Sequence, residues 1–213
     1  MKTDELVTLL ATGADPVDRH VAMRRYAIAL SGGVVGAALL LSMLLRVRPD
    51  LAEAALQPLF WIKLGFVASL VAAGLFANLR LSRPGARLDW VPAAIAAPIL
   101  LMWIIGGWTL LDAEPQQRLD LFFGATWKSC PFLIAMLAIP LFIGIMWAMR
   151  GLAPTRPRQA GFAAGLLAGA TAALVYCLHC PELETPFIGF WYLLGILIPA
   201  GFGAWIGGRL LRW

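Results

Sequence analysis

Three cysteines and one histidine are the side chains of this sequence with the most distinctive chemistry. Cys130 precedes a proline, and Cys177, His179 and Cys180 lie together in the segment 177–181. Thiolates and imidazoles bind zinc and softer metal ions, and two thiols can also form a disulfide. Three interpretations are open. They are a disulfide or other thiol redox chemistry, with Cys130 and Cys180 the favoured pair; a metal site of Cys130, Cys177, His179 and Cys180; and small buried side chains without chemistry.

The spacing and the number of these residues exclude two familiar kinds of site. His179 lies inside the Cys-x-x-Cys segment and not after it, so the segment is not a c-type haem attachment motif. A quinone-linked disulfide oxidase is expected to use two redox pairs, and the 3 cysteines of this chain do not supply them.

The composition shows what must position these side chains. Of 213 residues, 61% are hydrophobic and 14% are charged, whereas soluble domains have about 45–50% and about 25%. A water-soluble globule of this size cannot bury so much apolar surface, so the chain must lie in a lipid bilayer. Soluble enzymes, secreted disulfide scaffolds and disordered chains are thereby excluded. The net charge of +5 does not by itself indicate nucleic-acid binding, which needs a basic face, and no direct contact with nucleic acid is expected.

Six apolar stretches are long enough for a helix to cross the hydrocarbon of a bilayer, which takes about 20 residues. The sequence therefore predicts an all-α polytopic membrane protein: a bundle of six transmembrane helices over 27–213, preceded by a short helical tail, 1–26. The predicted spans are approximately 27–45, 59–79, 90–111, 131–149, 160–178 and 187–208.

Lys and Arg residues predict the orientation of this bundle. If the N-terminus is inside, twelve of the 17 lie on the cytoplasmic side, and only Arg46, Arg48, Arg118 and Lys128 lie on the other. Cytoplasmic loops carry such an excess, so both termini are predicted to be cytoplasmic in a bacterial inner membrane. All three cysteines then face the oxidising side, where disulfides can persist.

Two features inside the spans carry expectations of their own. The remaining basic residue, Lys63, lies near the outer start of the second span and is expected to extend its long stem to the headgroups; a buried partner such as an outer-loop carboxylate is the alternative. Gly161, Gly165 and Gly169 recur at four-residue spacing, which lets helix backbones approach closely. They predict a packing seam within one bundle, with homodimerisation as the alternative.

The tail before the first span is the other candidate site. A short amphipathic helix is predicted to begin at Thr3 and to end at Gly13, and a second helix is predicted to begin at Asp15-Pro16 and to continue into the membrane. A helix of this length is marginal in water. It either becomes ordered in the groove of a partner, or it lies on the membrane surface while Arg24 and Arg25 serve only the topology.

The combined pattern resembles the NrsF family of membrane anti-sigma factors, which inhibit extracytoplasmic-function (ECF) sigma factors. The resemblance covers essentially the whole chain and depends on the tail motif Thr-Asp-Glu-Leu-Val at 3–7, on Asp-Pro-Val at 15–17, and on the two Cys-Pro steps at Cys130 and Cys180 that flank the outer face of six spans.

The resemblance implies a regulator and not an enzyme. The tail would bind the sigma factor, and the expected contact residues are Leu6, Val7, Leu9, Leu10, Val17, Val21, Arg24 and Arg25. Cys130 and Cys180 would sense oxidants or heavy metals, with Cys177 and His179 as an extra thiol or ligand. No cofactor is expected with certainty; a heavy-metal or zinc ion at the outer cysteines is one alternative. A membrane thiol-disulfide oxidoreductase or a small transporter is the alternative function.

Overall fold

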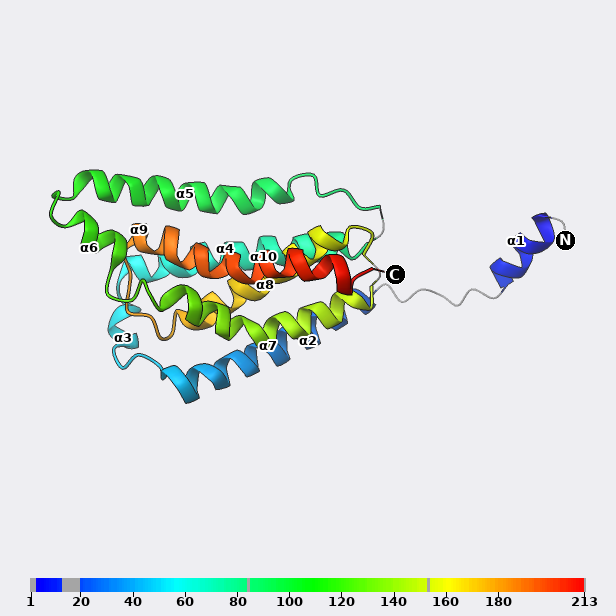
Figure 1. Cartoon of the computed structure of the whole chain (residues 1–213), viewed down its shortest axis with the longest axis horizontal. Helices are drawn as coiled ribbons and strands as arrows, with labels where there is room; N and C mark the ends of the chain where they lie inside the picture. Colours follow the sequence, from blue (N-terminus) through cyan, green and yellow to red (C-terminus); the bar gives the residue numbers. More distant parts are fainter. Residues whose placement is uncertain (1–2, 13–19, 84, 153, 213) are drawn as a thin grey trace.

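The chain is entirely helical over the residues that a computed structural model describes, which are 3–12, 20–83, 85–152 and 154–212; no strand occurs among them (Figure 1). Six helices are long and apolar enough to cross a membrane, which confirms the predicted all-α class and the number of spans. They are Val21–Leu45, Pro58–Leu81, Val91–Asp112, Cys130–Arg150, Pro157–Tyr176 and Thr185–Leu210. The predicted spans differ from them by a few residues at their ends.

Short helices and two π-helical segments complete the order of elements. In sequence the elements are α1 (Thr3–Thr12), α2 (Val21–Leu40), η1 (Leu41–Leu45), α3 (Leu51–Ala54), α4 (Pro58–Leu81), α5 (Val91–Asp112), α6 (Arg118–Phe123), α7 (Cys130–Arg150), α8 (Pro157–Tyr176), α9 (Thr185–Phe187), η2 (Ile188–Tyr192) and α10 (Leu193–Leu210). The two π-helical segments, η1 and η2, continue α2 and precede α10, so each of these two spans contains one.

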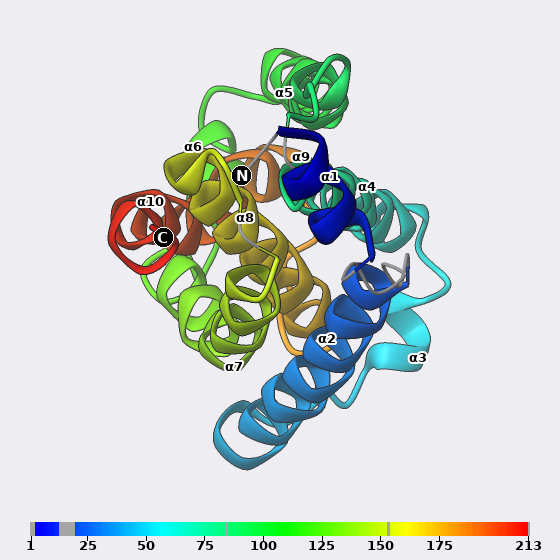
Figure 2. The same cartoon turned by 90° about the vertical axis from the view of Figure 1, so that its right-hand side faces the viewer.

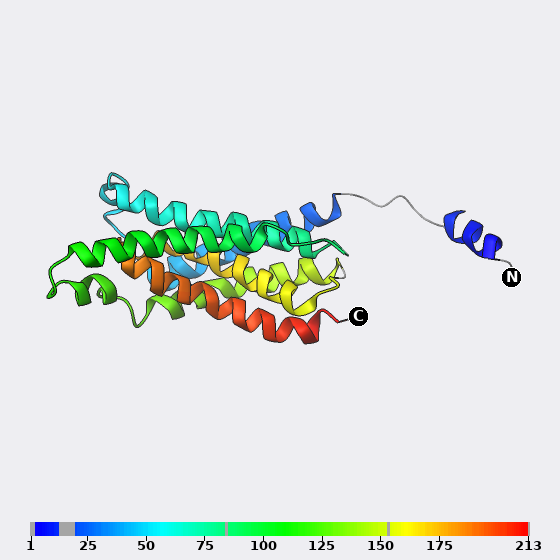
Figure 3. The same cartoon turned by 90° about the horizontal axis from the view of Figure 1, so that it is seen from above.

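Helix α8 is the centre of the bundle. It packs against α4, α7 and α10, and 83% of its most apolar window is buried. Helix α5 lies at the edge, where it contacts α4 and α9, and only 11% of its window is buried (Figure 2). The bundle has two ends (Figures 1 and 3). We call the end with α3, α6 and the α8–α9 loop the cysteine end, and the end with the start of α2 and the chain's C-terminus the tail end.

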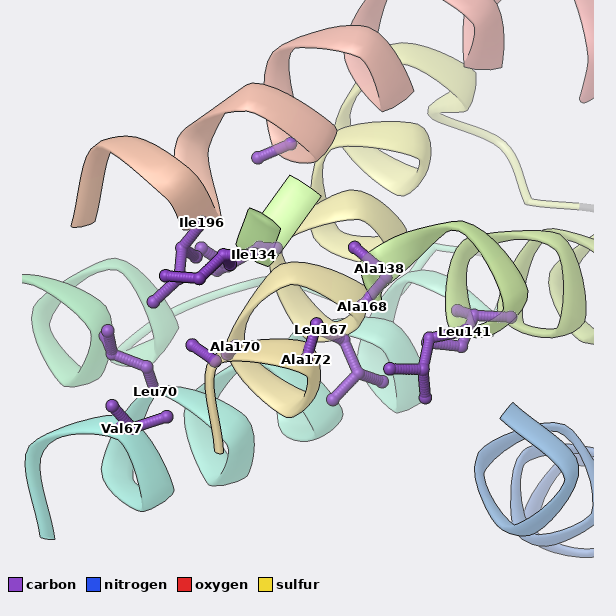
Figure 4. Close-up of a cluster of buried hydrophobic side chains, with 14 of the residues drawn as sticks. Val67, Leu70, Ile134, Ala138, Leu141, Leu167, Ala168, Ala170, Ala172 and Ile196 are labelled. Atoms are coloured by element: carbon purple, nitrogen blue, oxygen red, sulfur yellow. The ribbon is translucent and has the colours of Figure 1, made fainter. Parts of the chain in front are cut away.

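The core of the bundle combines branched side chains with small residues. Figure 4 shows Val67 and Leu70 of α4 and Ile134 of α7 around the alanines of α8. A Cβ atom at Gly161 or Gly165 would collide with a main-chain carbonyl of α10. The spaced glycines therefore form a seam between α8 and α10 of the same chain, as predicted for packing within one bundle.

The first helix is present as predicted, since α1 begins at Thr3 and ends at Thr12. The predicted start of a second helix at Asp15-Pro16 lies outside the described residues. Helix α2 is described from Val21, so the last residues assigned to the tail form its first turns, and Tyr26 is buried with 1% of its surface exposed.

Candidate functional site

The three cysteines are brought together at the cysteine end by two pieces of backbone, the start of α7 and the segment that follows α8. Cys130 is the first residue of α7, Cys177 directly follows α8, and Cys180 lies three residues further, before Pro181. The backbone N–H of Cys180 donates to the carbonyl of Tyr176 at 3.1 Å, which turns the chain back towards the bundle. All three side chains are fully buried, with 0% of their surface exposed, and all three are free thiols.

Two of the thiols form a pair, and the third has different surroundings. The thiols of Cys130 and Cys180 lie within hydrogen-bonding reach of each other. That contact and the nearby Lys63 ammonium hold the pKa of the Cys180 thiol below its ordinary value, although burial acts in the opposite direction. For Cys177, burial dominates and raises the pKa of the thiol to about 11. The Cys180 thiol thus lies close to both Cys130 and Lys63, whereas burial dominates the surroundings of Cys177.

Lys63 of α4 lies beside this pair, and the expectation that it reaches the headgroups is wrong. Its side chain is fully buried. Its Nζ donates to the main-chain carbonyls of Cys180 at 3.1 Å and Glu182 at 2.9 Å. It also lies 4.8 Å from the centre of the Tyr192 ring, a cation–π distance. The alternative partner, an outer-loop carboxylate, does not bind Lys63 either, because Glu182 accepts the hydrogen bond of Lys63 with its main-chain carbonyl.

Two further contacts fix the loop that carries Cys180. The Glu182 carboxylate accepts hydrogen bonds from the backbone N–H groups of Ala125 at 2.9 Å and Thr126 at 3.2 Å, which precede α7. The Arg48 guanidinium donates to the Cys180 carbonyl at 3.4 Å and binds Asp50 at 2.6 Å. The Arg48 partner lowers the pKa of the Asp50 carboxyl to about 2. The α8–α9 loop is therefore attached to α4, to the segment before α3 and to the segment before α7.

His179 contacts groups other than the two thiols of the pair, although it lies next to Cys180 in the sequence. Its Nδ1 is 2.8 Å from the carbonyl oxygen of Arg46, and its ring lies 5.6 Å from that of Tyr176. Within the described ranges, no three His, Cys, Asp or Glu side chains are arranged to hold a metal ion. The four-residue metal set is thus not assembled in this conformation.

Tyr192 and Lys63 were not among the predicted site residues. Tyr192 lies in the π-helical segment η2, and its buried hydroxyl lies beside the thiols of Cys177 and Cys180. π-helical turns often occur at functional sites, but they cannot be recognised in a single sequence. The signal for Lys63 was present, because an ionisable residue inside a span usually faces the bundle interior.

The candidate partner surface at the other end is α1. Asp4, Thr8 and Thr12 follow one another at four-residue spacing, and their side chains form one polar face: the Thr8 hydroxyl donates to the Asp4 carbonyl and the Thr12 hydroxyl to that of Thr8. Leu6 and Val7 lie elsewhere on the helix and are 43% and 58% exposed. The side chains of Leu9 and Leu10, and Val17 as a whole, lie outside the described residues. Figure 1 shows α1 away from the bundle, on the side of the tail end.

The remaining predicted contact residues lie in the first turns of α2. Val21 is 37% exposed and Arg24 is also exposed. Arg25 is half-buried, and its guanidinium lies 5.4 Å from the centre of the Trp147 ring of α7. Arg25 therefore also contributes to packing of α2 against α7.

The tail end of α4 is joined to α2 by buried hydroxyls. The Tyr26 and Ser82 hydroxyl oxygens are 2.9 Å apart, and the Ser82 hydroxyl is 2.7 Å from the carbonyl of Asn78, to which it donates. Because a hydroxyl has one proton, Tyr26 is the donor to Ser82. The Asn78 amide in turn donates to the carbonyl of Ala163 in α8 at 2.7 Å.

Comparison with known proteins gives a consistent result over the whole chain. A family model described as NrsF, negative regulator of sigma F, matches residues 10–213. The chain is 61% identical over 213 residues to the probable anti-sigma-F factor NrsF of Azospira oryzae. It is 40% identical over 217 aligned residues to the anti-sigma-F factor NrsF of Caulobacter vibrioides. Both matches cover 100% of each chain. No solved structure matches the chain.

Proposed function

This chain belongs to the NrsF family of negative regulators of sigma F, and we propose that it holds an ECF sigma factor on its N-terminal segment and releases it after chemistry at Cys130 and Cys180. NrsF proteins are anti-sigma factors, so the partner is a sigma factor and the role is regulatory. The single observation that carries the rest is the separation of the exposed helix α1 from a buried thiol pair at the opposite end of a six-helix bundle.

The distribution of basic residues supports the orientation that this function needs. Among the described residues, ten Lys and Arg lie in the segments that flank the tail end, and four lie in the segments of the cysteine end. The positive-inside rule then places α1 and both termini in the cytoplasm, where sigma factors act. The cysteines then face the periplasm of a bacterial inner membrane, an oxidising compartment that external oxidants and metal ions reach before they reach the cytoplasm.

Helix α1 suits capture by a groove on the partner. Its polar face, which includes Asp4 and Thr8, is opposed by the exposed side chain of Leu6. A short amphipathic helix of this kind docks its apolar face into a hydrophobic groove. Because α1 is marginal alone, binding and ordering would occur together, and a modest change in its attachment to the bundle would alter the affinity.

The thiol pair suits a sensor because Cys130 begins α7 whereas Cys180 lies in the α8–α9 loop. Reaction with a two-electron oxidant forms one S–S bond, transfers two electrons to the oxidant and releases two protons. A soft metal ion binds the same pair as thiolates and displaces those protons. Either reaction joins the start of α7 to the α8–α9 loop. A disulfide or a metal–thiolate bond supplies several kcal/mol, and a complete shift of a two-state equilibrium needs about 5.5 kcal/mol.

Affinity capture tests the binding half of this proposal. Detergent-solubilised protein with a C-terminal tag should recover a sigma factor, identified by mass spectrometry. Leu6→Gln should weaken recovery about 10- to 100-fold, because burial of one leucine is worth about 1.5–3 kcal/mol. Thr8→Gln, on the polar face of the same helix, is the matched control and should bind as the wild type does. Failure of the wild type to recover any sigma factor would contradict the proposal.

A reporter for the sigma factor's target genes tests the sensing half. Cys130→Ser with Cys180→Ser should abolish induction by oxidants and soft metal ions, since serine neither forms a disulfide nor binds soft metals well. The single change Cys177→Ser is the control and should leave induction intact. An unchanged response in the double variant would refute a sensing role for the pair.

A further inference from the structure

Helix α4 contacts the two places where the proposed function acts. At the cysteine end its Lys63 binds the carbonyls of Cys180 and Glu182. At the tail end the hydroxyl of Ser82, which directly follows α4, accepts a hydrogen bond from Tyr26 of α2. Tyr26 lies in the second turn of α2, just after the segment that leads to α1. The same helix thus touches the sensing loop and the root of the N-terminal segment.

The contact at Lys63 depends strictly on the position of the loop. In the part of the chain that the structure describes, no Asp or Glu forms an ion pair with Lys63. Its charge is buried, and among the described residues the groups that stabilise it are two main-chain carbonyls, the face of one aromatic ring and the nearby thiol of Cys180. A buried charge that loses its partners is strongly unfavourable. The loop with Cys180 therefore cannot move from α4 without a large cost, and α4 tends to move with it.

The contact at Tyr26 is equally specific. The Tyr26 side chain is 1% exposed and that of Ser82 is 6% exposed. Removal of either hydroxyl would leave α2 without its buried polar contact to α4. Asn78, one turn before Ser82, also binds the Ala163 carbonyl, so this end of α4 is hydrogen-bonded to both α2 and α8.

Helix α4 can transmit a displacement along its length because it is continuous. It has 24 residues without an internal proline, whereas α5, α7 and α10 contain Pro98, Pro140 and Pro199. At 1.5 Å per residue, the distance from Lys63 to Ser82 along the axis is about 28 Å. A small shift or rotation at one end of such a helix appears at the other end without an intermediate hinge.

We propose that α4 couples the cysteine loop to the N-terminal segment, with Lys63 as the positioning residue at the loop and the Tyr26–Ser82 hydrogen bond as the connection to α2. This inference rests on the proposed function, because it assigns the path between its two sites. In this scheme, reaction of Cys130 with Cys180 displaces the carbonyls that hold Lys63. Helix α4 follows, and the change reaches α2 through Ser82.

Substitution of Lys63 tests the cysteine end of this path. Lys63→Met keeps most of the side-chain volume and removes the donor, so the loop should open more often. Labelling of Cys180 by a maleimide reagent in native membranes should be roughly tenfold faster, since hydrogen bonds to a charged group are worth about 1.5–3 kcal/mol. Induction of the sigma-factor reporter by the same oxidant should fall to a ratio near one. Lys63→Arg retains a cationic donor and should restore induction, and Ile62→Met is the matched control on the same turn.

Removal of the hydroxyls tests the tail end. Tyr26→Phe and Ser82→Ala should each reduce induction to a ratio near one while labelling of Cys180 stays at the wild-type rate. Ser69→Ala is the control, because the Ser69 hydroxyl donates to the Phe66 carbonyl within α4 itself. Immunoblots of membranes show whether each variant is inserted at the wild-type level.

Two outcomes separate this inference from the proposed function. The proposed function fails if the wild type shows no induction, or if the Cys130→Ser, Cys180→Ser variant is induced as fully as the wild type. If the wild type responds and Lys63→Met or Tyr26→Phe responds as fully as the wild type, the coupling through α4 is wrong although the function stands. If Lys63→Met is poorly inserted into the membrane, its loss of induction is not informative, and Lys63→Arg is tested in its place. Failure of Lys63→Arg to respond would also refute the positioning role.

Discussion

The glycine seam between α8 and α10 makes a sharp prediction about stability. A Cβ atom built on Gly165 of α8 meets the Pro199 carbonyl oxygen and carbon and the Ala200 Cα, all of them main-chain atoms of α10. Backbone cannot rotate away as a side chain can, so Gly165→Ala must push the two helices apart. At Gly201 of α10, by contrast, a Cβ atom would have no neighbouring atom within 4 Å. Gly201→Ala is therefore the matched control for the same chemical change.

The two substitutions should change the stability of the protein in opposite directions. Overpacking of a close helix contact costs about 1–3 kcal/mol, while alanine in an open helical position gains up to about 1 kcal/mol over glycine from backbone entropy alone. For a domain of this size, 1 kcal/mol shifts the Tm by about 2–4 °C. Gly165→Ala should therefore lower the Tm by about 2–12 °C, and Gly201→Ala should leave it unchanged or raise it by up to about 4 °C.

The buried thiols provide the assay. A maleimide dye that fluoresces on reaction reports unfolding in detergent, because Cys130, Cys177 and Cys180 are all fully buried. Scans at one heating rate rank the variants even where unfolding is irreversible. Equal Tm values for Gly165→Ala and Gly201→Ala would refute the close approach of α8 and α10.

Three further predictions concern the cysteine end. Tyr192→Phe removes a buried hydroxyl whose polar neighbours among the described residues are thiols, which are weak hydrogen-bond acceptors. The same dye assay should therefore give an equal or higher Tm, because up to about 3 kcal/mol of desolvation cost is relieved; a clear decrease would contradict this reasoning. At neutral pH Cys177 should be alkylated far more slowly than free cysteine in the folded protein, because burial excludes the reagent and raises the pKa of the thiol to about 11. Mass spectrometry of alkylated peptides from pH 7 to pH 10 should show its labelling rise with pH. The ion pair between Asp50 and Arg48 should persist under mild acid, because the Asp50 pKa is lowered from 3.8 to about 2. The stabilising contribution of the pair is complete above about pH 4 and is lost as the pH falls through about 2. NMR titration of the Asp50 carboxyl checks the midpoint.

Much of the fold follows from the sequence because the bilayer constrains it strongly. Apolar length alone located six spans, and the four-residue spacing of Gly161 and Gly165 predicted a close packing seam. The position of Cys130 before one span and Cys180 after another placed both at one end of the bundle. Each of these inferences uses local sequence only. The neighbour of each helix is a different matter, since periodicity identifies the buried face of a helix but not the helix that covers it.

The position of Lys63 shows where local reasoning went wrong and what would have corrected it. Proximity to the end of the span suggested that its stem reaches the headgroups, but the direction of a side chain depends on its helical face and not on its depth. At 100° per residue, Lys63 lies on the same face as Leu70, Gly74, Asn78 and Leu81, all buried in α4. A face that combines a lysine, an asparagine and a glycine within a span is typical of a surface that packs against protein, because lipid offers the two polar groups no partners. The helical face would therefore have predicted that Lys63 is buried, and only its partners, 117 and 119 residues away, required the structure.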